Sequence, residues 1–276
     1  FSKILGKTKG YPADFIAEGL DQTRGWFYSM LVLGTALFGK SPYKNVVVNG
    51  LVLAEDGRKM SKRERNYPDL MLIVNKYGAD ALRYFLMSSP VVHGQDVCFS
   101  EKLVDEVVKK HIGRLNNVVS FYEMYAQKNY PETKSDHPLD TWITNRLHEL
   151  GHEVTENLEK YEIDKAVRPF AGFIDDLSTW YVRRSRDRFK GENASPALET
   201  TRTILLELSK LLAPFMPFLA EDIYQRVSGG ESVHLENWPK YPKADTKILS
   251  SMIEVRLVAS LGLEARMKAK KNVRQP

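Results

Sequence analysis

The sequence predicts an α/β segment followed by an all-α segment. An apolar helical stripe near the start precedes the β-branched run Asn45–Leu53, and an exposed Asp56-Gly57 turn follows that run. From Leu70 onward the apolar period is that of helices. The order of helix, strand and loop is typical of a doubly wound α/β unit, in which ligands bind beyond the carboxyl ends of the strands.

The first helix is expected to begin at Asp21, whose carboxylate is a suitable N-cap. Gly39 is expected to end this helix, and Pro42 prevents its return. Trp26 lies on the apolar stripe and is interpreted as a core residue. The run Asn45–Leu53 is consistent with a buried parallel strand.

The rest of the chain reads as helices. One helix is expected around 81–86 and a longer one at Lys102–Tyr125, and the polar stretch Lys128–Pro138 is the best domain boundary. Ser195 and Pro196 are a good helix start. Four or five antiparallel helices beyond the boundary would make a bundle.

Composition restricts the classes of protein. The 276 residues carry 43% hydrophobic and 27% charged residues and a formal charge of +5, which suits a soluble globular protein and permits a polyanionic partner. The lone Cys98 cannot form an internal disulfide, and no Cys/His cluster has zinc spacing, so a cytoplasmic location is expected. No apolar stretch is long enough for a membrane span. Both ends read as cuts from a longer chain.

The loop after the strand carries two lysines, Lys59 and Lys62, on either side of Ser61. Ammonium groups placed in advance stabilise a departing polyphosphate more than its ground state, and a hydroxyl adds a donor. The alternative interpretation is a solvated basic loop.

The sequence around this loop favours a catalytic role over a solvated basic loop. Lys59–Arg63 resembles the KMSKS element of class I aminoacyl-tRNA synthetases, and Glu18–Phe27 resembles the EGxDQTRGWF segment of the isoleucyl-tRNA synthetase family. The resemblance implies that Lys59, Ser61 and Lys62 are catalytic and that Lys62 also binds ATP. It implies a pocket for the aminoacyl-adenylate that is lined by Glu18, Gly19, Asp21 and Gln22. It also implies backbone contacts to adenine from Asn49, Gly50 and Val52. The alternatives are an acidic turn that caps a core helix, and an Asn-Gly turn at a strand end.

His111–Arg114 resembles the HIGH tetrapeptide of this family only superficially. It follows the KMSKS-type loop, lies within an expected helix and lacks the last His. His111 is therefore interpreted as an ordinary helical residue. The HIGH half and the editing domain are expected before Phe1, so the piece alone is expected to be inactive.

The segment Trp180–Phe189 resembles WYVRRSRxRF of the isoleucyl anticodon-binding domain. The side chains expected to contact tRNA phosphates are those of Arg183, Arg184, Arg186 and Arg188. A solvated helix face with Asp187 as counter-charge is the alternative. Two positions depart from the family, Leu70 in place of Pro and Lys190 in place of Trp.

The resemblance implies three parts: the C-terminal half of a Rossmann-like class I catalytic domain (1–55), a connecting region with the KMSKS-type loop (56–127), and an antiparallel anticodon-binding helix bundle (138–276). The expected parent activity is ATP-dependent attachment of isoleucine to tRNA(Ile) through isoleucyl-adenylate. Mg²⁺ is expected to accompany ATP, with no protein metal ligand evident, and the oligomeric state is expected to be monomeric. A valyl or leucyl synthetase fragment and a non-catalytic tRNA-binding module are the alternative functions.

Overall fold

A computed structural model describes residues 11–61, 63–64, 66–126, 135–191 and 194–272. The chain forms two compact units: unit 1 comprises Phe1–Ile112 and Thr155–Arg168, and unit 2 comprises Gly113–Val154 and Pro169–Pro276. The change of unit at 112–113 falls inside the helical stretch predicted at Lys102–Tyr125, whereas the predicted boundary at Lys128–Pro138 lies largely outside the described residues. The three-part division of the sequence stays a prediction.

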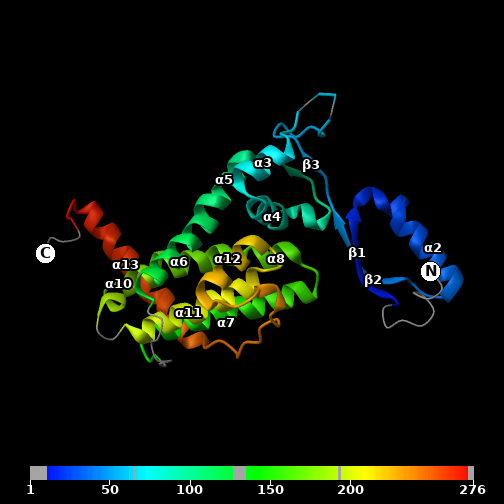
Figure 1. Ribbon diagram of the computed structural model, residues 1–276. Coiled ribbons are helices and arrows are strands. Elements are labelled where there is room, and N and C mark those ends of the chain that lie inside the picture. The colour runs from blue at the N-terminus through cyan, green and yellow to red at the C-terminus, as the bar shows by residue number, and fades with distance from the viewer. Residues whose placement is uncertain (1–10, 62, 65, 127–134, 192–193, 273–276) are drawn as a thin grey trace. The chain divides into compact units, whose positions relative to one another are not determined.

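Unit 1 combines short parallel strands with helices (Figure 1). Its elements in chain order are β1 (Ala13–Gly19), η1 (Leu20–Arg24), α2 (Trp26–Phe38), β2 (Tyr43–Asn49), β3 (Val52–Leu53), α3 (Leu70–Tyr77), α4 (Ala79–Met87), η2 (Pro90–His93), β4 (Val97–Cys98), α5 (Glu101–Val107), the π-helical η3 (Val108–Ile112) and α8 (Ile163–Val167). Strand β1 pairs with β2, and β3 pairs with β4. The α/β character predicted for the first part of the chain is confirmed.

Strands β1 and β2 run parallel because α2 carries the chain back between them. Their register pairs Ile16 with Val46 and Gly19 with Asn49, so the two carboxyl ends lie side by side. Strand β1 is not predicted from the sequence. The predicted strand Asn45–Leu53 is present, but it is divided into β2 and β3. Its burial was overestimated, since Val46 is 40% exposed.

Helix α2 begins differently from the prediction. The capping role predicted for Asp21 is wrong: the residue lies in the 3₁₀ turn η1, and no side chain caps the Gly25 position. Instead, the Trp26 backbone N–H donates to Gln22 Oε1 over 2.8 Å. Trp26 is 43% exposed while Phe27 is buried, so the core role predicted for Trp26 is also wrong. Gly39 ends the helix in a left-handed conformation (φ 66°), as predicted.

Unit 2 is helical. Its elements are α6 (Gly113–Tyr125), most of α7 (Pro138–Glu159), α9 (Pro169–Asp175), the π-helical η4 (Asp176–Val182), α10 (Arg183–Lys190), α11 (Ser195–Leu212), α12 (Pro217–Ser228), η5 (Val233–Leu235) and α13 (Thr246–Lys268). Helix α6 packs against α9, η4, α11 and α12, and α11 packs along α12. The core is made of large apolar side chains, among them Trp142, Phe170, Phe173, Leu205 and Phe215. The all-α character predicted for this part is confirmed.

Within the described residues, no helix is both long and apolar enough to cross a membrane.

Candidate functional site

The predicted adenylate-pocket residues lie at the carboxyl edge of the parallel sheet. Glu18 is the register partner of Val48, and Gly19 is the partner of Asn49. Because both strands end here, the β1 end and the Asn49-Gly50 turn occupy the same edge, where ligands of parallel sheets bind. The side chains of Glu18 and Asp21 are exposed and can receive an ammonium or hydroxyl donor from a ligand.

The turn after β1 is held by side-chain hydrogen bonds. Gln22 Nε2 donates to Asp21 Oδ2 over 3.0 Å, while Gln22 Oε1 accepts from the start of α2. A Cβ on Gly19 would lie 2.8 Å from Asp21 Oδ1. The glycine therefore leaves room for Asp21 to turn back over the strand end. The structure thus places Gly19, Asp21 and Gln22 in one turn, and their role in an adenylate pocket stays a prediction.

The chain after β2 is attached to the segment around residues 91–97. Gly50 N–H donates to the Val91 carbonyl over 2.8 Å, and Leu51 N–H donates to Asp96 Oδ1 over 2.9 Å. A Cβ on Gly50 would lie 2.1 Å from the Gln95 carbonyl oxygen, so only glycine fits. Val52 then enters the pairing of β3 with β4. The residues expected at the adenine are consequently held by backbone contacts that the sequence analysis did not predict.

The KMSKS-type loop extends from a tight turn. Ala54 N–H donates to the Arg58 carbonyl over 2.9 Å, and Gly57 takes a left-handed conformation (φ 81°) in the Asp56-Gly57 turn that the sequence predicted. Backbone and side-chain hydrogen bonds from Arg58 lower the pKa of the Asp56 carboxyl. This ion pair keeps the acidic group of the turn satisfied by its own neighbour.

Lys59 is exposed on this loop, and Ser61 is half-buried. Lys62 lies outside the described residues. Asn66 closes the loop, since its Nδ2 donates to the Lys59 carbonyl over 3.0 Å and its Oδ1 accepts from the Ser61 N–H over 2.8 Å. This role of Asn66 is not predictable from the residue pattern. The only signal is its place three residues after the Lys59–Arg63 stretch that resembles the KMSKS element.

The four predicted RNA-contact arginines differ in their surroundings. Arg183, Arg184 and Arg186 are exposed on α10. Arg188 instead turns inward, where its NH1 donates to Asp140 Oδ1 over 2.7 Å and its NH2 pairs with the other carboxylate oxygen. Asp140 is 2% exposed. The hydrogen bond to Asp140 raises the pKa of the Arg188 guanidinium, so the arginine stays charged.

Two aromatic residues flank these arginines. Tyr181 is buried, and its hydroxyl donates to Asp140 Oδ1 over 2.8 Å. Burial raises the pKa of that hydroxyl. Trp180 is half-buried, with the guanidinium groups of Arg184 and Arg256 at 4.5 and 5.1 Å from its ring centroid. Tyr181 therefore shares the Asp140 carboxylate with Arg188, and Trp180 packs against the guanidinium of Arg184.

Comparison with known proteins places this geometry in a family. The family model of class I tRNA synthetases (I, L, M and V) matches residues 4–99, and that of the anticodon-binding domain of tRNA ligases matches residues 140–276. The isoleucine–tRNA ligase of Chlamydia trachomatis serovar D is 44% identical over 280 residues, which cover 96% of this chain and 27% of the relative. The chain belongs to the class I tRNA synthetases.

Other relatives of this tRNA synthetase chain agree. The isoleucine–tRNA ligases of Chlamydia muridarum and Protochlamydia amoebophila are 45% and 43% identical over 96% and 97% of the chain, and 27% of each relative is covered. The chain therefore spans about a quarter of the length of the curated relatives it matches. A crystal structure of LeuRS from Agrobacterium radiobacter K84, in a ternary complex with tRNA and LeuAMS, superposes with a TM-score of 0.63 at 19% identity. That match covers 86% of this chain and 29% of the other, and it supports the fold.

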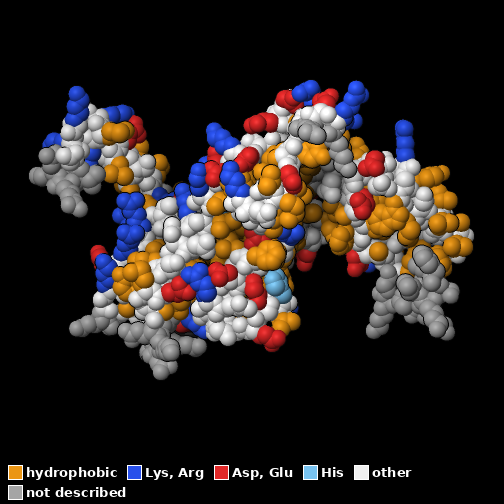
Figure 2. Space-filling view, turned by 45° about the horizontal axis from the view of Figure 1, so that its top comes forward, with side chains coloured by type: hydrophobic (Ala, Val, Ile, Leu, Met, Phe, Trp, Pro, Cys, Tyr) orange, Lys and Arg blue, Asp and Glu red, His pale blue; other side chains and the backbone are white. Residues whose placement is uncertain are grey.

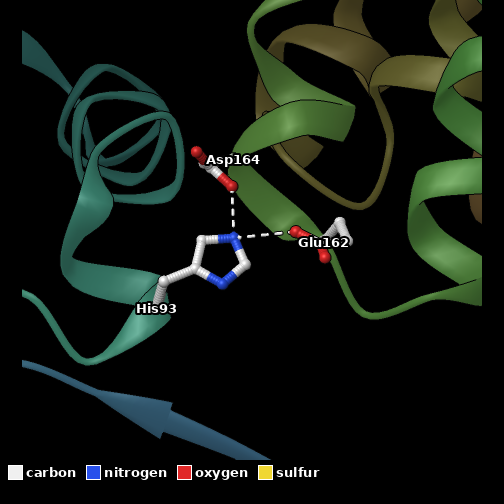
Figure 3. Close-up of side chains that lie close together, drawn as sticks. All are labelled: His93, Glu162 and Asp164. Carbon is white, nitrogen blue, oxygen red and sulfur yellow. Dashed lines mark hydrogen bonds and ion pairs between the residues drawn. The ribbon is translucent and has the colours of Figure 1, made fainter.

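One cluster in unit 1 of this synthetase chain has the residue types of a metal site. His93 Nε2 lies 2.5 Å from Asp164 Oδ1 and 3.2 Å from Glu162 Oε2 (Figure 3). Ligands of one tetrahedral zinc ion stand roughly 3.3 Å apart, so the 2.5 Å separation is that of a hydrogen bond. Asp164 is also paired with Arg168 over 2.6 Å. Hydrogen bonding and charge pairing account for the cluster, which ties η2 to the start of α8, and we assign no metal to it.

Proposed function

We propose that the complete protein attaches isoleucine to tRNA(Ile) through isoleucyl-adenylate, and that this chain supplies the KMSKS-type loop and the anticodon-binding part. The observation that carries the proposal is the shared carboxyl edge of β1 and β2. There, Gly19 and Asn49 are register partners in a chain 44% identical to an isoleucine–tRNA ligase. The exposed loop at Lys59 belongs to the same compact unit.

The reaction assigned to this edge has two steps. In the first, an isoleucine carboxylate oxygen attacks the α-phosphorus of ATP, a new P–O bond forms, and the bond to the bridging oxygen breaks to release pyrophosphate. In the second, a ribose hydroxyl at the tRNA 3′ end attacks the acyl carbon, loses its proton, and AMP leaves. The protein's contribution is to place charges and dipoles where negative charge develops.

Each group has a role in this scheme. Glu18 and Asp21 accept hydrogen bonds from the ammonium and from ribose hydroxyls, and Gln22 positions Asp21. The backbone at Asn49, Gly50 and Val52 faces the adenine. Lys59, Lys62 and Ser61 stabilise the departing pyrophosphate, with Lys62 as the principal cation.

Mg²⁺ belongs to this scheme as part of the substrate, bound to the phosphates of ATP. Among the described residues, the one group of His and carboxylate side chains that converges closely enough to hold an ion is the His93 cluster, and its contacts are those of hydrogen bonds and an ion pair. No step of this scheme is assigned to a protein-bound metal.

Unit 2 is assigned as an antiparallel bundle that binds the anticodon part of the tRNA. Exposed Arg183, Arg184 and Arg186 meet phosphates, while Arg188 holds α10 in place through Asp140. Long-range attraction between a chain of formal charge +5 and RNA assists this binding. We keep a monomeric state and a cytoplasmic location as parts of the proposal.

The surface of α2 supports the view that the rest of a catalytic domain covers this chain. The large apolar side chains of α2 that are more than a third exposed are Trp26, Tyr28, Leu31, Val32, Leu33, Leu37 and Phe38. Figure 2 shows hydrophobic side chains gathered over this part of the molecule. Parallel sheets are normally covered on both faces. The relatives are about four times longer, so the complete protein contains further chain to cover α2, and the fragment alone is expected to lack adenylate synthesis.

The test is amino-acid-dependent ATP–pyrophosphate exchange by the complete protein. Isoleucine should drive exchange, and Lys62→Ala should lower its rate by about 10²–10³-fold with little change in isoleucine binding, because the cations act as charge develops. Lys44→Ala is the control, since Lys44 is an exposed lysine at the amino end of β2, paired with Asp14. Exchange driven by valine or leucine, or an unchanged rate in Lys62→Ala, would contradict the proposal. Salt-sensitive tRNA binding without exchange would favour a tRNA-binding module instead.

A further inference from the structure

The amide of Asn66 joins the two sides of the KMSKS-type loop. Its Nδ2 donates to the carbonyl of Lys59 over 3.0 Å, and its Oδ1 accepts from the N–H of Ser61 over 2.8 Å. Asn66 and Ser61 are both half-buried, whereas Lys59 and Arg63 are exposed. A single polar side chain therefore contacts the backbone at both residues of the proposed catalytic set that the structure describes.

The two sides of the loop are fixed by different contacts. The side that leads into the loop is fixed by the Leu53–Lys59 antiparallel bridge and by the hydrogen bond from Ala54 N–H to the Arg58 carbonyl. Beyond it, the Arg63 N–H donates to Ser61 Oγ over 3.2 Å. The Asn66 side chain returns the later part of the loop to the backbone of Lys59, and the Arg58–Glu64 ion pair (NH1 to Oε2, 3.3 Å) joins the same two sides through side chains. Without Asn66, the Ser61 N–H would lose the acceptor that it has among the described residues.

We propose that Asn66 is a positioning residue for the pyrophosphate-release step: it fixes the backbone of Lys59 and Ser61 so that their side chains meet the leaving group in one orientation. The inference rests on the proposed function. Charges on an exposed loop stabilise a transition state well only if they are ordered beforehand, since ordering a residue costs conformational entropy. Two hydrogen bonds from one amide supply that order before ATP binds.

The chemistry of the site requires an amide. Lys59 offers a carbonyl oxygen that needs a donor, and Ser61 offers an N–H that needs an acceptor. An amide side chain carries both on one planar group. A carboxylate of the same shape accepts from Ser61 but cannot donate to Lys59. It would also place negative charge beside the loop at which pyrophosphate charge develops. Asn66→Asp is thus a nearly isosteric probe of the donor function.

The experiment separates the two steps of the reaction in the complete protein. ATP–pyrophosphate exchange measures adenylate formation, and single-turnover transfer from preformed isoleucyl-adenylate to tRNA measures the second step. Asn66→Ala and Asn66→Asp should each lower the kcat of exchange by about 10- to 100-fold, the scale expected when catalytic groups are misplaced. The KM for isoleucine, the rate of transfer and the Tm should stay at wild-type values, because the adenylate pocket and the core are untouched.

The matched control is Asn45→Ala. Asn45 is an exposed asparagine on β2 whose Nδ2 donates to the Asp14 carbonyl over 2.9 Å, far along the strand from its carboxyl end. This variant should exchange at the wild-type rate. Wild-type exchange in both Asn66 variants would overturn the inference, and so would an equal fall in both steps accompanied by a lower Tm. If the wild-type protein itself shows no isoleucine-dependent exchange, the proposed function fails instead, so the two failures are distinguishable.

Discussion

Gly19 and Asn49 are register partners at the carboxyl ends of β1 and β2. The pair places the turn that holds Asp21 and the turn that begins at Gly50 at the same edge of the sheet. Two segments some thirty residues apart thereby meet at one edge of the sheet. The predictions for the catalytic part follow from how closely the backbone is packed at this edge.

Gly19→Ala should weaken isoleucine binding without unfolding the protein. The added Cβ would lie 2.8 Å from Asp21 Oδ1, and the far end of this exposed side chain can move away. Its hydrogen bond with Gln22 would then be lost, and one such bond is worth about 1 kcal/mol. We expect the KM for isoleucine in exchange assays to rise several-fold with the Tm unchanged. Gly172→Ala is the control, since no atom lies within 4 Å of its added Cβ. An unaltered KM in Gly19→Ala would count against the assigned role of Asp21.

Gly50→Ala should damage both stability and ATP binding. Its Cβ would lie 2.1 Å from the Gln95 carbonyl oxygen, and this atom belongs to backbone that cannot rotate away. The bond from Gly50 N–H to the Val91 carbonyl would have to break, at a cost of about 1–3 kcal/mol for the buried partner left behind. Thermal melting should show the loss, and the KM for ATP should rise. Leu51→Ala is the neighbouring control, because this exposed side chain can be shortened while its backbone bonds remain. Equal Tm values and equal KM values for ATP in the two variants would contradict the conclusion that only glycine fits at position 50.

The sequence predicted the elements whose signals are local. The apolar stripe and Gly39 predicted α2 and its end, and the β-branched valines predicted β2. Strand β1 was missed because Asp14 and Glu18 interrupt its apolar pattern, and its pairing is set by a strand some thirty residues later. The cap predicted at Asp21 failed because Gln22 satisfies the start of α2 instead.

The candidate site was predictable only where residues resemble a family motif. Glu18–Gln22 and Lys59–Ser61 were identified in this way, and their roles stay predictions. The contacts of Asn66, the close approach at Gly50 and the inward turn of Arg188 depend on partners distant in sequence or on loop geometry. No periodicity in the sequence encodes them. Arg188 looks like Arg186 in the sequence, and only the fold shows that Asp140 lies beside it.

Arg188→Ala should lower the stability of the protein, whereas Arg183→Ala should weaken its binding to tRNA. The first leaves the carboxylate of Asp140, which is 2% exposed, without its cation. Breaking a buried ion pair costs about 3–5 kcal/mol, with Tyr181 still donating to Asp140 to limit the loss. Arg183 is exposed, so its removal should change the free energy of unfolding by less than about 0.5 kcal/mol. It should instead weaken tRNA binding and reduce the salt dependence by about one unit of the log–log slope. Denaturant unfolding and salt-titrated tRNA binding measure the two effects. A destabilised Arg183→Ala together with a stable Arg188→Ala that binds tRNA weakly would contradict the roles given to the two arginines.

Glu123→Gln should destabilise unit 2 in a pH-dependent way. Arg226 on α12 donates to Glu123 on α6 through Nε over 2.9 Å and NH2 over 2.6 Å. These hydrogen bonds lower the pKa of the Glu123 carboxyl from its usual value of 4.5. A folded-state pKa below the unfolded one stabilises the fold at pH values above the unfolded pKa, and this contribution is lost as pH falls through the folded pKa.

The two side chains of this pair are 30% and 39% exposed, so solvent screening limits the contribution to about 0.5–1 kcal/mol at neutral pH. The Tm of Glu123→Gln should therefore lie below that of the wild type at pH 7. The difference should shrink as the pH is lowered from 4.5, because the wild-type carboxyl becomes protonated and resembles the amide. Glu254→Gln on the exposed face of α13 should show no such convergence, because this side chain is exposed to solvent. A Tm difference for Glu123→Gln that is independent of pH would mean that the pair contributes through packing of α6 on α12 and not through its charge.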